Sequence, residues 1–331
     1  MRTSIPHEKY RALVVYRNLA SFVLNDIRIL EKMCNVRPLC YIGKKKLPAL
    51  GAALARSDLV YCWFVLGYAT TSVLLSNILR KKSIVVAGGW DVIYLPEIGY
   101  GSMIDRKRIK KTKYALAKAD RVLAVSDFNK KEVLQWVDRD VDIVYNGVDT
   151  DKYRPKGEKK DLVLTVAAID GLVRYKKKGV ETFLRVAAKM PDIDFAIIGK
   201  NTPEWDRKLK EKAPKNTIIT GRVTSERLVS YFQEARVYAQ LSYHESFGVA
   251  LAEAMSCECV PVVTKRSALP EVVGDTGFYV DYGDVDGTVE AVRKALDRPN
   301  GEKCRRRVLE NFSLEIRESK LLRIVEEVLS K

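Results

Sequence analysis

Two glutamates, Glu245 and Glu253, lie in a segment that could bind a phosphorylated ligand. Glu245 follows an apolar run of strand length and precedes a run whose pattern predicts a helix. At the expected start of that helix, Gly248 lets the backbone come close to a ligand. The N–H groups of Phe247, Gly248 and Val249 then lack partners within the helix and lie at the positive end of its dipole. We therefore expect an anion site that suits a diphosphate.

Glu253 falls about two turns into the same expected helix, among small apolar residues. A carboxylate in such surroundings needs a hydroxyl or a cation as its partner, and a ribose diol would serve. For two glutamates alone, surface carboxylates on an amphipathic helix would be the simpler interpretation. The flanking segments favour the binding site, and they read Glu-Ser-Phe-Gly, Ala-Glu-Ala-Met, Val-Pro-Val-Val and Leu-Pro-Glu-Val-Val within residues 245–273.

Apolar runs of strand length alternate with amphipathic stretches along the chain, which predicts parallel sheets covered by helices on both faces. The alternation restarts after a polar linker at 153–160. We therefore expect an α/β protein with two doubly wound, Rossmann-like domains facing a cleft, with ligands at the carboxyl ends of the strands. Strands are expected at 12–16, 36–42, 59–65, 83–87, 122–125, 143–145, 162–169, 195–198, 237–241, 260–263 and 278–280. Helices are expected at 225–234, 247–256, 284–296 and 314–329.

The linker sets the domain boundaries. We predict a first domain over 1–152, a second over 153–312, and a final helix in 313–331 that packs back on the first domain.

Residues 59–79 carry no formal charge and are long enough to span a bilayer. Their β-rich start, the interruption at Gly67 and several hydroxyl side chains instead favour a strand followed by a helix.

The chain of 331 residues has a net charge of +16, of which +11 falls in residues 1–150. Six of the eight residues from Arg106 to Lys113 are basic. A basic first half indicates an acidic partner, which could be anionic lipid, a phosphorylated acceptor or nucleic acid. The plainer alternative is a solvated helix face. For a membrane surface, the neighbouring Tyr100, Met103 and Ile104 would dip into the interface.

The chain's six cysteines are scattered and its histidines number two, so no zinc pattern arises. The cysteine usage fits a reducing compartment, and the start of the chain has no apolar core like that of a signal peptide. We expect a cytoplasmic protein that can lie peripherally on the inner face of a membrane.

The series from Glu245 to Val273 resembles the retaining glycosyltransferases of family 4, which have the GT-B fold. Weaker matches lie at 86–92 and 145–149. The resemblance implies a hexosyltransferase-type enzyme that moves a sugar from a nucleotide-sugar donor to a lipid-linked or envelope glycan acceptor. It also implies that the first domain lies on the acceptor side and that the second binds the donor.

The resemblance implies roles for the matching residues of the second domain. Glu245 would contact hydroxyls of the donor sugar and Glu253 the ribose, while the backbone at Phe247, Gly248 and Val249 would meet the sugar or the diphosphate. The rest of the nucleotide site would be formed by Gly199, Arg222 and Val223.

A basic pair in the second domain, Arg174 and Lys178, would neutralise the diphosphate. The family usually has Gly-Arg directly after the first strand of this domain, whereas residues 168–171 read Ala-Ile-Asp-Gly. In the first domain, Asp91 lies in a turn where many members have a histidine, and it would orient the sugar or an acceptor hydroxyl; capping the turn is the alternative.

Fixed cations can stabilise a leaving diphosphate without a metal. The Asp-x-Asp pairs of the sequence fall in turns or at the ends of elements, so we expect neither a metal nor a bound cofactor. Two other classes remain open. An epimerase, hydrolase or phosphorylase of the same fold would not need a glycan acceptor, although nothing marks the pyridoxal-binding lysine of a phosphorylase. A nucleic-acid-binding protein would show a recognisable motif, which the sequence lacks, so we expect no nucleic-acid partner.

Overall fold

The protein is described by a computed structural model for residues 10–297 and 300–331. Its contacts divide the chain into two compact units. The first unit runs up to Gly147 and includes Glu315–Lys331, and the second is Val148–Leu314. The boundaries predicted from the sequence, 152/153 and 312/313, lie a few residues away.

The first unit is built on a six-stranded parallel sheet in the order β2-β1-β3-β4-β5-β6. Its inner strands read as continuous apolar runs because helices cover both faces, and all five residues of β3 are buried. The strands are β1 (Tyr10–Tyr16), β2 (Cys34–Cys40), β3 (Leu59–Trp63), β4 (Lys82–Ala87), β5 (Arg121–Ala124) and β6 (Asp142–Ile143). The helices are α1 (Ser21–Glu31), α2 (Leu47–Ala55), α3 (Gly67–Ile78), α4 (Arg106–Lys118) and α5 (Asp127–Leu134), with short 3-10 turns at Lys44–Lys46, Pro96–Ile98 and Ser102–Ile104.

The uncharged segment at 59–79 forms β3 followed by α3. Serine and threonine hydroxyls of α3 bond to backbone carbonyls, as in the bond from Ser76 to Ser72. In the described ranges, no helix combines the length and the apolarity needed to cross a membrane.

The last helix, α14 (Leu314–Leu329), is anchored in the first unit by a buried ion pair. Arg317 donates from Nε and Nη2 to the two carboxylate oxygens of Asp26, at 2.6 and 2.8 Å. The same carboxylate also accepts hydrogen bonds from Tyr61 and Trp63 of β3. Because both charged side chains are almost fully buried, loss of either partner would leave an unpaired charge in the interior.

The second unit contains another six-stranded parallel sheet, in the order β12-β11-β10-β7-β8-β9. Its strands are β7 (Lys160–Val166), β8 (Asp194–Ile198), β9 (Thr217–Gly221), β10 (Ala235–Gln240), β11 (Val260–Thr264) and β12 (Phe278–Val280). Its helices are α6 (Leu172–Lys177), α7 (Val180–Lys189), α8 (Pro203–Lys212), α9 (Ser225–Glu234), α10 (Val249–Ser256), α11 (Leu269–Val273), α12 (Val285–Asp297) and α13 (Gly301–Asn311).

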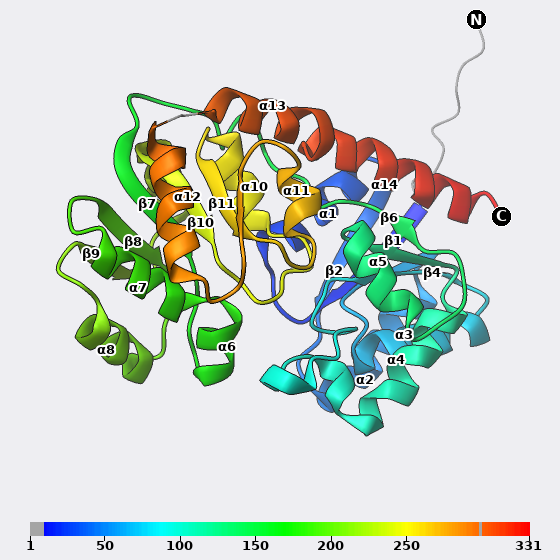
Figure 1. The fold of residues 1–331 in the computed structure, drawn as a ribbon. Coiled ribbons are helices and arrows are strands. Elements are labelled where there is room, and N and C mark those ends of the chain that lie inside the picture. Colours follow the sequence, from blue (N-terminus) through cyan, green and yellow to red (C-terminus); the bar gives the residue numbers. More distant parts are fainter. Residues whose placement is uncertain (1–9, 298–299) are drawn as a thin grey trace, which may run out of the picture. The chain divides into compact units, whose positions relative to one another are not determined.

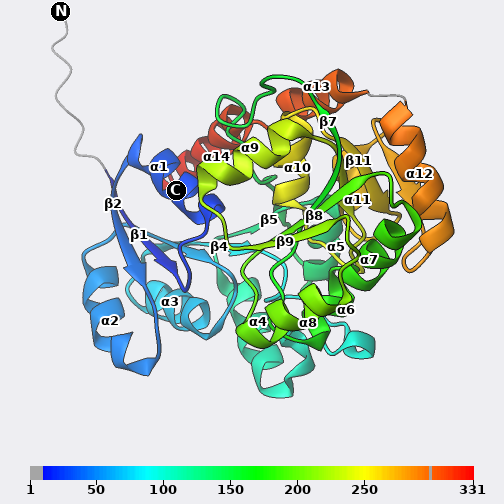
Figure 2. The ribbon, with the colours of Figure 1, turned by 90° about the vertical axis from the view of Figure 1, so that its left-hand side faces the viewer.

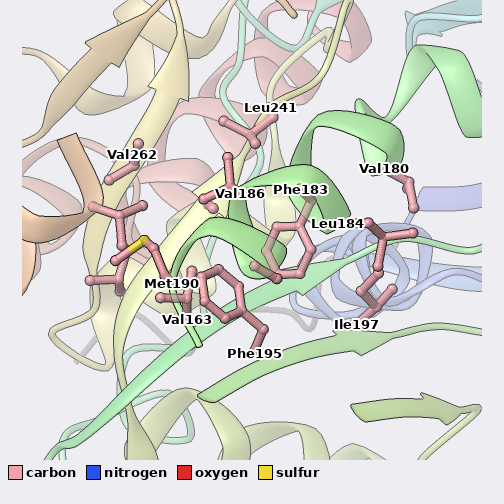
Figure 3. Packing of buried hydrophobic residues seen from close by; sticks show 14 of the residues in the cluster. Val163, Val180, Phe183, Leu184, Val186, Met190, Phe195, Ile197, Leu241 and Val262 are labelled. Carbon is pink, nitrogen blue, oxygen red and sulfur yellow. The ribbon is translucent and has the colours of Figure 1, made fainter. Parts of the chain in front are cut away.

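Helices cover both faces of this second sheet. On one face, α7 and α12 pack against each other (Figure 1), and on the other α9 and α10 pack on the central strands (Figure 2). Phe183 and Val186 of α7 meet Phe195 and Val163 of the strands in a buried cluster (Figure 3). The expectation of two parallel, Rossmann-like sheets covered by helices is confirmed.

Candidate functional site

The carboxyl ends of the second sheet gather most of the residues expected to bind a ligand. The strand order reverses between the neighbouring strands β7 and β10. Strands β8 and β9 lie on the β7 side of this point, and β11 and β12 lie on the β10 side. Ligands of doubly wound sheets bind outside the carboxyl ends at such a reversal. Lys178 follows β7 and α6, and Glu245 follows β10, so both lie beside it.

Glu245 and Lys178 are in direct contact at this edge. The Lys178 ammonium donates to Glu245 Oε1 at 2.7 Å. The same oxygen accepts from Gln240 Nε2 at 3.0 Å and from Ser242 Oγ at 2.9 Å. Lys177 Nζ lies 3.9 Å from Oε2. Glu245 is only 9% exposed, so its charge depends on these partners rather than on water.

The charge of Glu245 is fixed by its two lysines. Burial by itself raises the pKa of Glu245, but the charges of Lys177 and Lys178 and the hydrogen bonds from Lys178 and Ser242 outweigh burial and bring that pKa to about 2. The carboxylate is therefore ionised at neutral pH. Two cations facing one anion leave the cluster with a net positive charge, which can attract a phosphate.

The turn after β11 holds the backbone of Glu245. The N–H of Glu245 donates to Ser267 Oγ at 2.8 Å, and the N–H of Ala268 donates to the Glu245 carbonyl at 3.1 Å. Ser267 adopts a φ of 51°, a left-handed conformation that few non-glycine residues take. Such strain persists where the surrounding structure demands it, often at functional sites.

Gly179 lets the Lys178 segment approach Glu245. It has a φ of +64°, and a Cβ there would lie 1.9 Å from the carbonyl oxygen of Leu241, in the loop after β10. Any side chain would therefore push α7 away from that loop. Gly179 follows Lys178, the C-cap of α6, and is itself the N-cap of α7.

Glu253 lies inside α10 with an environment unlike that of Glu245. It is 8% exposed, and the phenol of Tyr153 lies beside it. Burial raises the pKa of Glu253 to about 7, against the opposing effects of the Tyr153 hydrogen bond and the Lys152 charge. Without a ligand, this carboxyl group is thus near half protonation at neutral pH.

The residues around the start of α10 take the expected positions. Gly248 is the N-cap of the helix with a φ of 98°, and Val249 is its first residue. The Phe247 side chain is 2% exposed and packs on Phe312, with ring centroids 5.4 Å apart. The Phe247 side chain therefore belongs to the packing of this unit, and a backbone contact of Phe247 with a ligand stays a prediction.

The remaining expected residues of the second unit follow other strands. Gly199 comes directly after β8, and its N–H donates to the carbonyl of Gly221 at 3.1 Å. Arg222, which is exposed, and Val223 follow β9. Arg174 lies apart from Glu245: its side chain is half exposed, and its Nε lies 3.2 Å from Asp170 Oδ1.

Asp91 belongs to the first unit and is fully buried. Its carboxylate accepts from the N–H of Val65 at 2.7 Å and from the N–H of Gly88 at 3.2 Å, and so joins the segments after β3 and β4. Burial raises the pKa of Asp91 to about 6, although these backbone N–H groups lower it. These contacts are those of a turn cap.

Four residues whose side chains lie beside the carboxyl groups of the two glutamates were not among the expected site residues. Gln240 and Ser242 lie two positions apart at the end of β10, a spacing that places side chains on one face of a strand. Lys177, which is 8% exposed, adjoins the expected Lys178. Tyr153 lies a hundred positions before Glu253, and no local signal joins them.

Comparisons with known proteins bear on the family. The family model described as glycosyl transferases group 1 matches residues 149–311, and that described as glycosyltransferase family 4 matches residues 26–152. One of the subunits of phosphatidylinositol N-acetylglucosaminyltransferase from Arabidopsis thaliana is 26% identical over 69% of this chain and 58% of its own length. An uncharacterised glycosyltransferase of Methanocaldococcus jannaschii is 23% identical over 89% of this chain and 79% of its own length. D-inositol 3-phosphate glycosyltransferase of Mycolicibacterium paratuberculosis is 28% identical over 55% of this chain and 45% of its own length. The chain thus spans only about half the length of the first and third of these relatives.

Solved structures share the fold at low sequence identity. Sucrose-phosphate synthase from Thermosynechococcus elongatus has a TM-score of 0.78 at 16% identity, covering 97% of this chain and 100% of its own. HepE from Anabaena, in complex with UDP and glucose, has a TM-score of 0.79 at 14% identity, covering 96% and 100%. Together the two family models cover residues 26–311. The chain belongs to the glycosyltransferases of family 4 and has their GT-B fold of two Rossmann-like domains.

Proposed function

We propose that this glycosyltransferase takes its sugar from a nucleotide-sugar donor bound at the carboxyl edge of the second sheet. The sugar would pass to a lipid-linked or glycan acceptor, with the retention of anomeric configuration that the resemblance implies. The observation that carries this proposal is the ionised Glu245 held by Lys177 and Lys178 at the strand-order reversal.

The two lysines suit a leaving diphosphate. Breaking a sugar–phosphate bond builds negative charge on the phosphate, which fixed cations stabilise. The ammonium of Lys178 has three N–H donors. It can therefore keep its bond to Glu245 and still donate to a phosphate oxygen.

The two oxygens of Glu245 differ in what they can still accept. Oε1 already accepts from Lys178, Gln240 and Ser242. Among described contacts, Oε2 has only the Lys177 ammonium, 3.9 Å away. Oε2 is therefore the oxygen that would accept a hydroxyl of the donor sugar and orient it for transfer.

The proposal is tested by a donor screen. Purified protein is incubated with UDP-, GDP-, ADP- and CDP-sugars and cell-derived lipid, and with inositol phosphates and phosphatidylinositol, which the names of two relatives suggest. We expect glycosylated product that retains the donor's anomeric configuration by NMR. Sugar released or isomerised without an acceptor would favour the hydrolase or epimerase. Absence of both turnover and nucleotide binding would overturn the proposal.

Nucleoside binding should release a proton from Glu253. Ribose hydroxyls that donate to the carboxylate favour its charged form and lower its pKa from about 7. At pH 7 we therefore expect release of up to about half a proton per nucleoside bound, falling toward zero at pH 9. Calorimetry in buffers of different ionisation enthalpy measures this number.

Glu253→Gln is the control for that measurement, and it should bind without releasing a proton. It should also change the pH dependence of stability. Because folding raises the pKa of Glu253, this carboxyl group makes its full contribution to the stability of the protein below about pH 4.5. That contribution is lost as the pH rises through 7, by roughly 3 kcal/mol at most. The variant should lack this loss between pH 5 and 8. Equal proton release by both proteins would remove Glu253 from the ribose site.

We also expect turnover to survive chelation. The charges of Lys177 and Lys178 take the place that a divalent cation would have on the diphosphate. With EDTA present, turnover should stay within about twofold of the untreated rate, a change of no more than ~0.4 kcal/mol in the barrier. Complete loss, restored by added magnesium or manganese, would contradict this expectation.

The proposal includes a peripheral membrane contact at the cytoplasmic face, made by α4. Its six basic residues between Arg106 and Lys113 are exposed, and among described residues only Arg108 has an ion pair, with Asp105. Each cation near an anionic surface contributes about 1 kcal/mol. The expected apolar contribution of Met103 is wrong because that side chain is fully buried.

Of the other two expected residues, Ile104 is 39% exposed and Tyr100 is partly buried, and further exposed apolar side chains lie on the neighbouring helix α3. Leu74 and Ile78 are 44% and 66% exposed, and α3 is joined to α4 by a hydrogen bond from Thr70 to the Lys111 carbonyl. Basic and apolar side chains on adjacent helices suit an anionic membrane interface.

Binding to liposomes should therefore require anionic lipid and fall at high salt. Reversing Lys107 and Lys110 to glutamate should abolish co-sedimentation. Reversing Lys208 and Lys210 of α8 is the matched control, since their charges are already paired with Glu204 and Asp206. Equal binding to neutral and anionic liposomes would contradict the membrane contact.

A further inference from the structure

Three side chains stack beside the candidate site, and we call them the tyrosine brace: Tyr243, Arg266 and Tyr282. They come from the loops after β10, β11 and β12. The Arg266 guanidinium lies 3.9 Å from the ring centroid of Tyr243, and its Nε donates to the Tyr243 carbonyl at 3.0 Å. The rings of Tyr243 and Tyr282 meet edge to face, with centroids 5.1 Å apart. These contacts join three separate loops into one cluster.

The tyrosine brace holds the carboxyl end of α6. The N–H of Tyr243 donates to the Lys177 carbonyl at 2.7 Å, and the Tyr282 hydroxyl donates to the Lys176 carbonyl at 2.6 Å. The last carbonyls of a helix lack their usual partners within the helix, and the Lys176 carbonyl accepts from the Gly179 N–H at 2.9 Å as well as from Tyr282. The brace supplies partners at the turn that carries Lys177 and Lys178 to Glu245.

α6 depends on such contacts because it has only six residues. A helix this short is not stable by itself. Its outer side chains give little support, since Leu172 is 56% exposed and Val173 is 37% exposed. Tyr175 packs on Trp205, with ring centroids 5.2 Å apart, but that contact does not touch the lysine turn. The tyrosine brace therefore adds to the backbone bonds of Lys178 and Gly179 in holding this turn.

We propose that Tyr282 is a positioning residue of the donor site. Its hydroxyl holds the Lys176 carbonyl and so keeps the ammonium groups of Lys177 and Lys178 on Glu245 and in reach of the donor diphosphate. This inference rests on the proposed function and goes beyond it, because Tyr282 acts through the lysine turn.

Tyr282→Phe tests this role, and the chain offers a matched control in Tyr279→Phe. The Tyr279 hydroxyl also donates to a backbone carbonyl, that of Gly274 at the end of α11. Each variant keeps its ring and loses one hydrogen bond of the same kind, so the two should lose similar stability. Only Tyr282→Phe should weaken binding of a nucleoside diphosphate, by about fivefold, as loss of one hydrogen bond predicts. Binding of the bare nucleoside should not change.

The measurement is calorimetric titration with UDP, ADP, GDP and CDP and with the matching nucleosides, alongside thermal unfolding. The KM for the nucleotide sugar should rise in Tyr282→Phe by the same factor as the diphosphate dissociation constant. If both variants bind diphosphates as tightly as the wild type, the positioning role is overturned and the proposed function stands. If the wild type binds none of the four diphosphates and turns over no nucleotide sugar, the proposed function fails and the inference fails with it.

Discussion

Glu245→Gln should lower turnover of the nucleotide sugar by about 100-fold or more, the cost of misplacing a reacting group. The amide has nearly the same shape as the carboxylate but no charge. It would no longer hold Lys177 and Lys178 by charge, and its oxygen would accept a sugar hydroxyl more weakly. Much of the affinity for the nucleoside should remain, because Glu253 and Tyr153 are untouched. Steady-state turnover and nucleoside titration on the same preparation measure the two effects.

The same substitution should destabilise the protein. Removing one partner of a buried ion pair leaves the other charge uncompensated, at a cost of about 3–5 kcal/mol. Because the pKa of Glu245 is lowered to about 2, its stabilising contribution is present above about 4.5 and is lost as pH falls toward 2. The difference in stability between wild type and variant should shrink over that range. Turnover must therefore be measured near neutral pH, well below the variant's unfolding temperature.

Glu290→Gln in α12 is the control for this substitution. Glu290 is exposed, and its carboxylate lies 3.8 Å from Lys294, so its loss should affect neither stability nor turnover. A folded Glu245→Gln variant with wild-type turnover would remove Glu245 from the donor site.

The sequence pattern pointed to Glu245 because its surroundings are local, whereas Lys178 was expected only from the family resemblance. A strand, a glycine and a helix start follow one another within a few residues, and each has its own signal. The partner of Glu253 could not be found in this way. Tyr153 reaches it only because β7 and β10 pair in the sheet and bring distant segments together.

The sequence predicted that Arg174 and Lys178 would act together on the diphosphate, and the structure gives their side chains different partners. In a continuous helix, residues four apart lie on one face, so the two cations would point the same way. In the structure Lys178 is the C-cap of α6, still right-handed, and its N–H donates to the Arg174 carbonyl at 2.9 Å. The side chains of Lys177 and Lys178 nevertheless reach Glu245, while that of Arg174 pairs with Asp170. Helix spacing thus brings the two backbones together but does not decide which carboxylate each side chain contacts.

One edge strand and one peripheral helix of the second unit were not predicted, although the edge strands β2, β6 and β12 were. Strand β9 is one edge of the second sheet, and its residues are intermediate or exposed rather than buried. An edge strand needs no continuous apolar run, so Thr217–Gly221 gave no strand signal. Helix α8 was missed for a similar reason, since Leu209 is its one buried residue.

Lys178→Met should weaken binding of nucleoside diphosphates by about 10- to 100-fold, the value of one charged hydrogen bond. The methionine side chain keeps most of the volume of lysine but has no charge to place on a phosphate. Binding of the bare nucleoside should change little, because no phosphate takes part. The effect should also fall as salt increases, since Lys178 is partly exposed.

Substitution of two neighbouring cations shows whether the effect is specific to Lys178 or follows from any loss of positive charge. Lys176→Met removes an exposed cation at the same turn, and Arg174→Met removes the other member of the pair expected from sequence. Both should bind diphosphates within about twofold of the wild type, as surface charges usually do. A loss in Arg174→Met as large as that in Lys178→Met would show that Arg174 reaches the phosphate when the donor binds. An equal loss for diphosphate and nucleoside in Lys178→Met would show instead that Lys178 supports the fold of the site without contacting the phosphate.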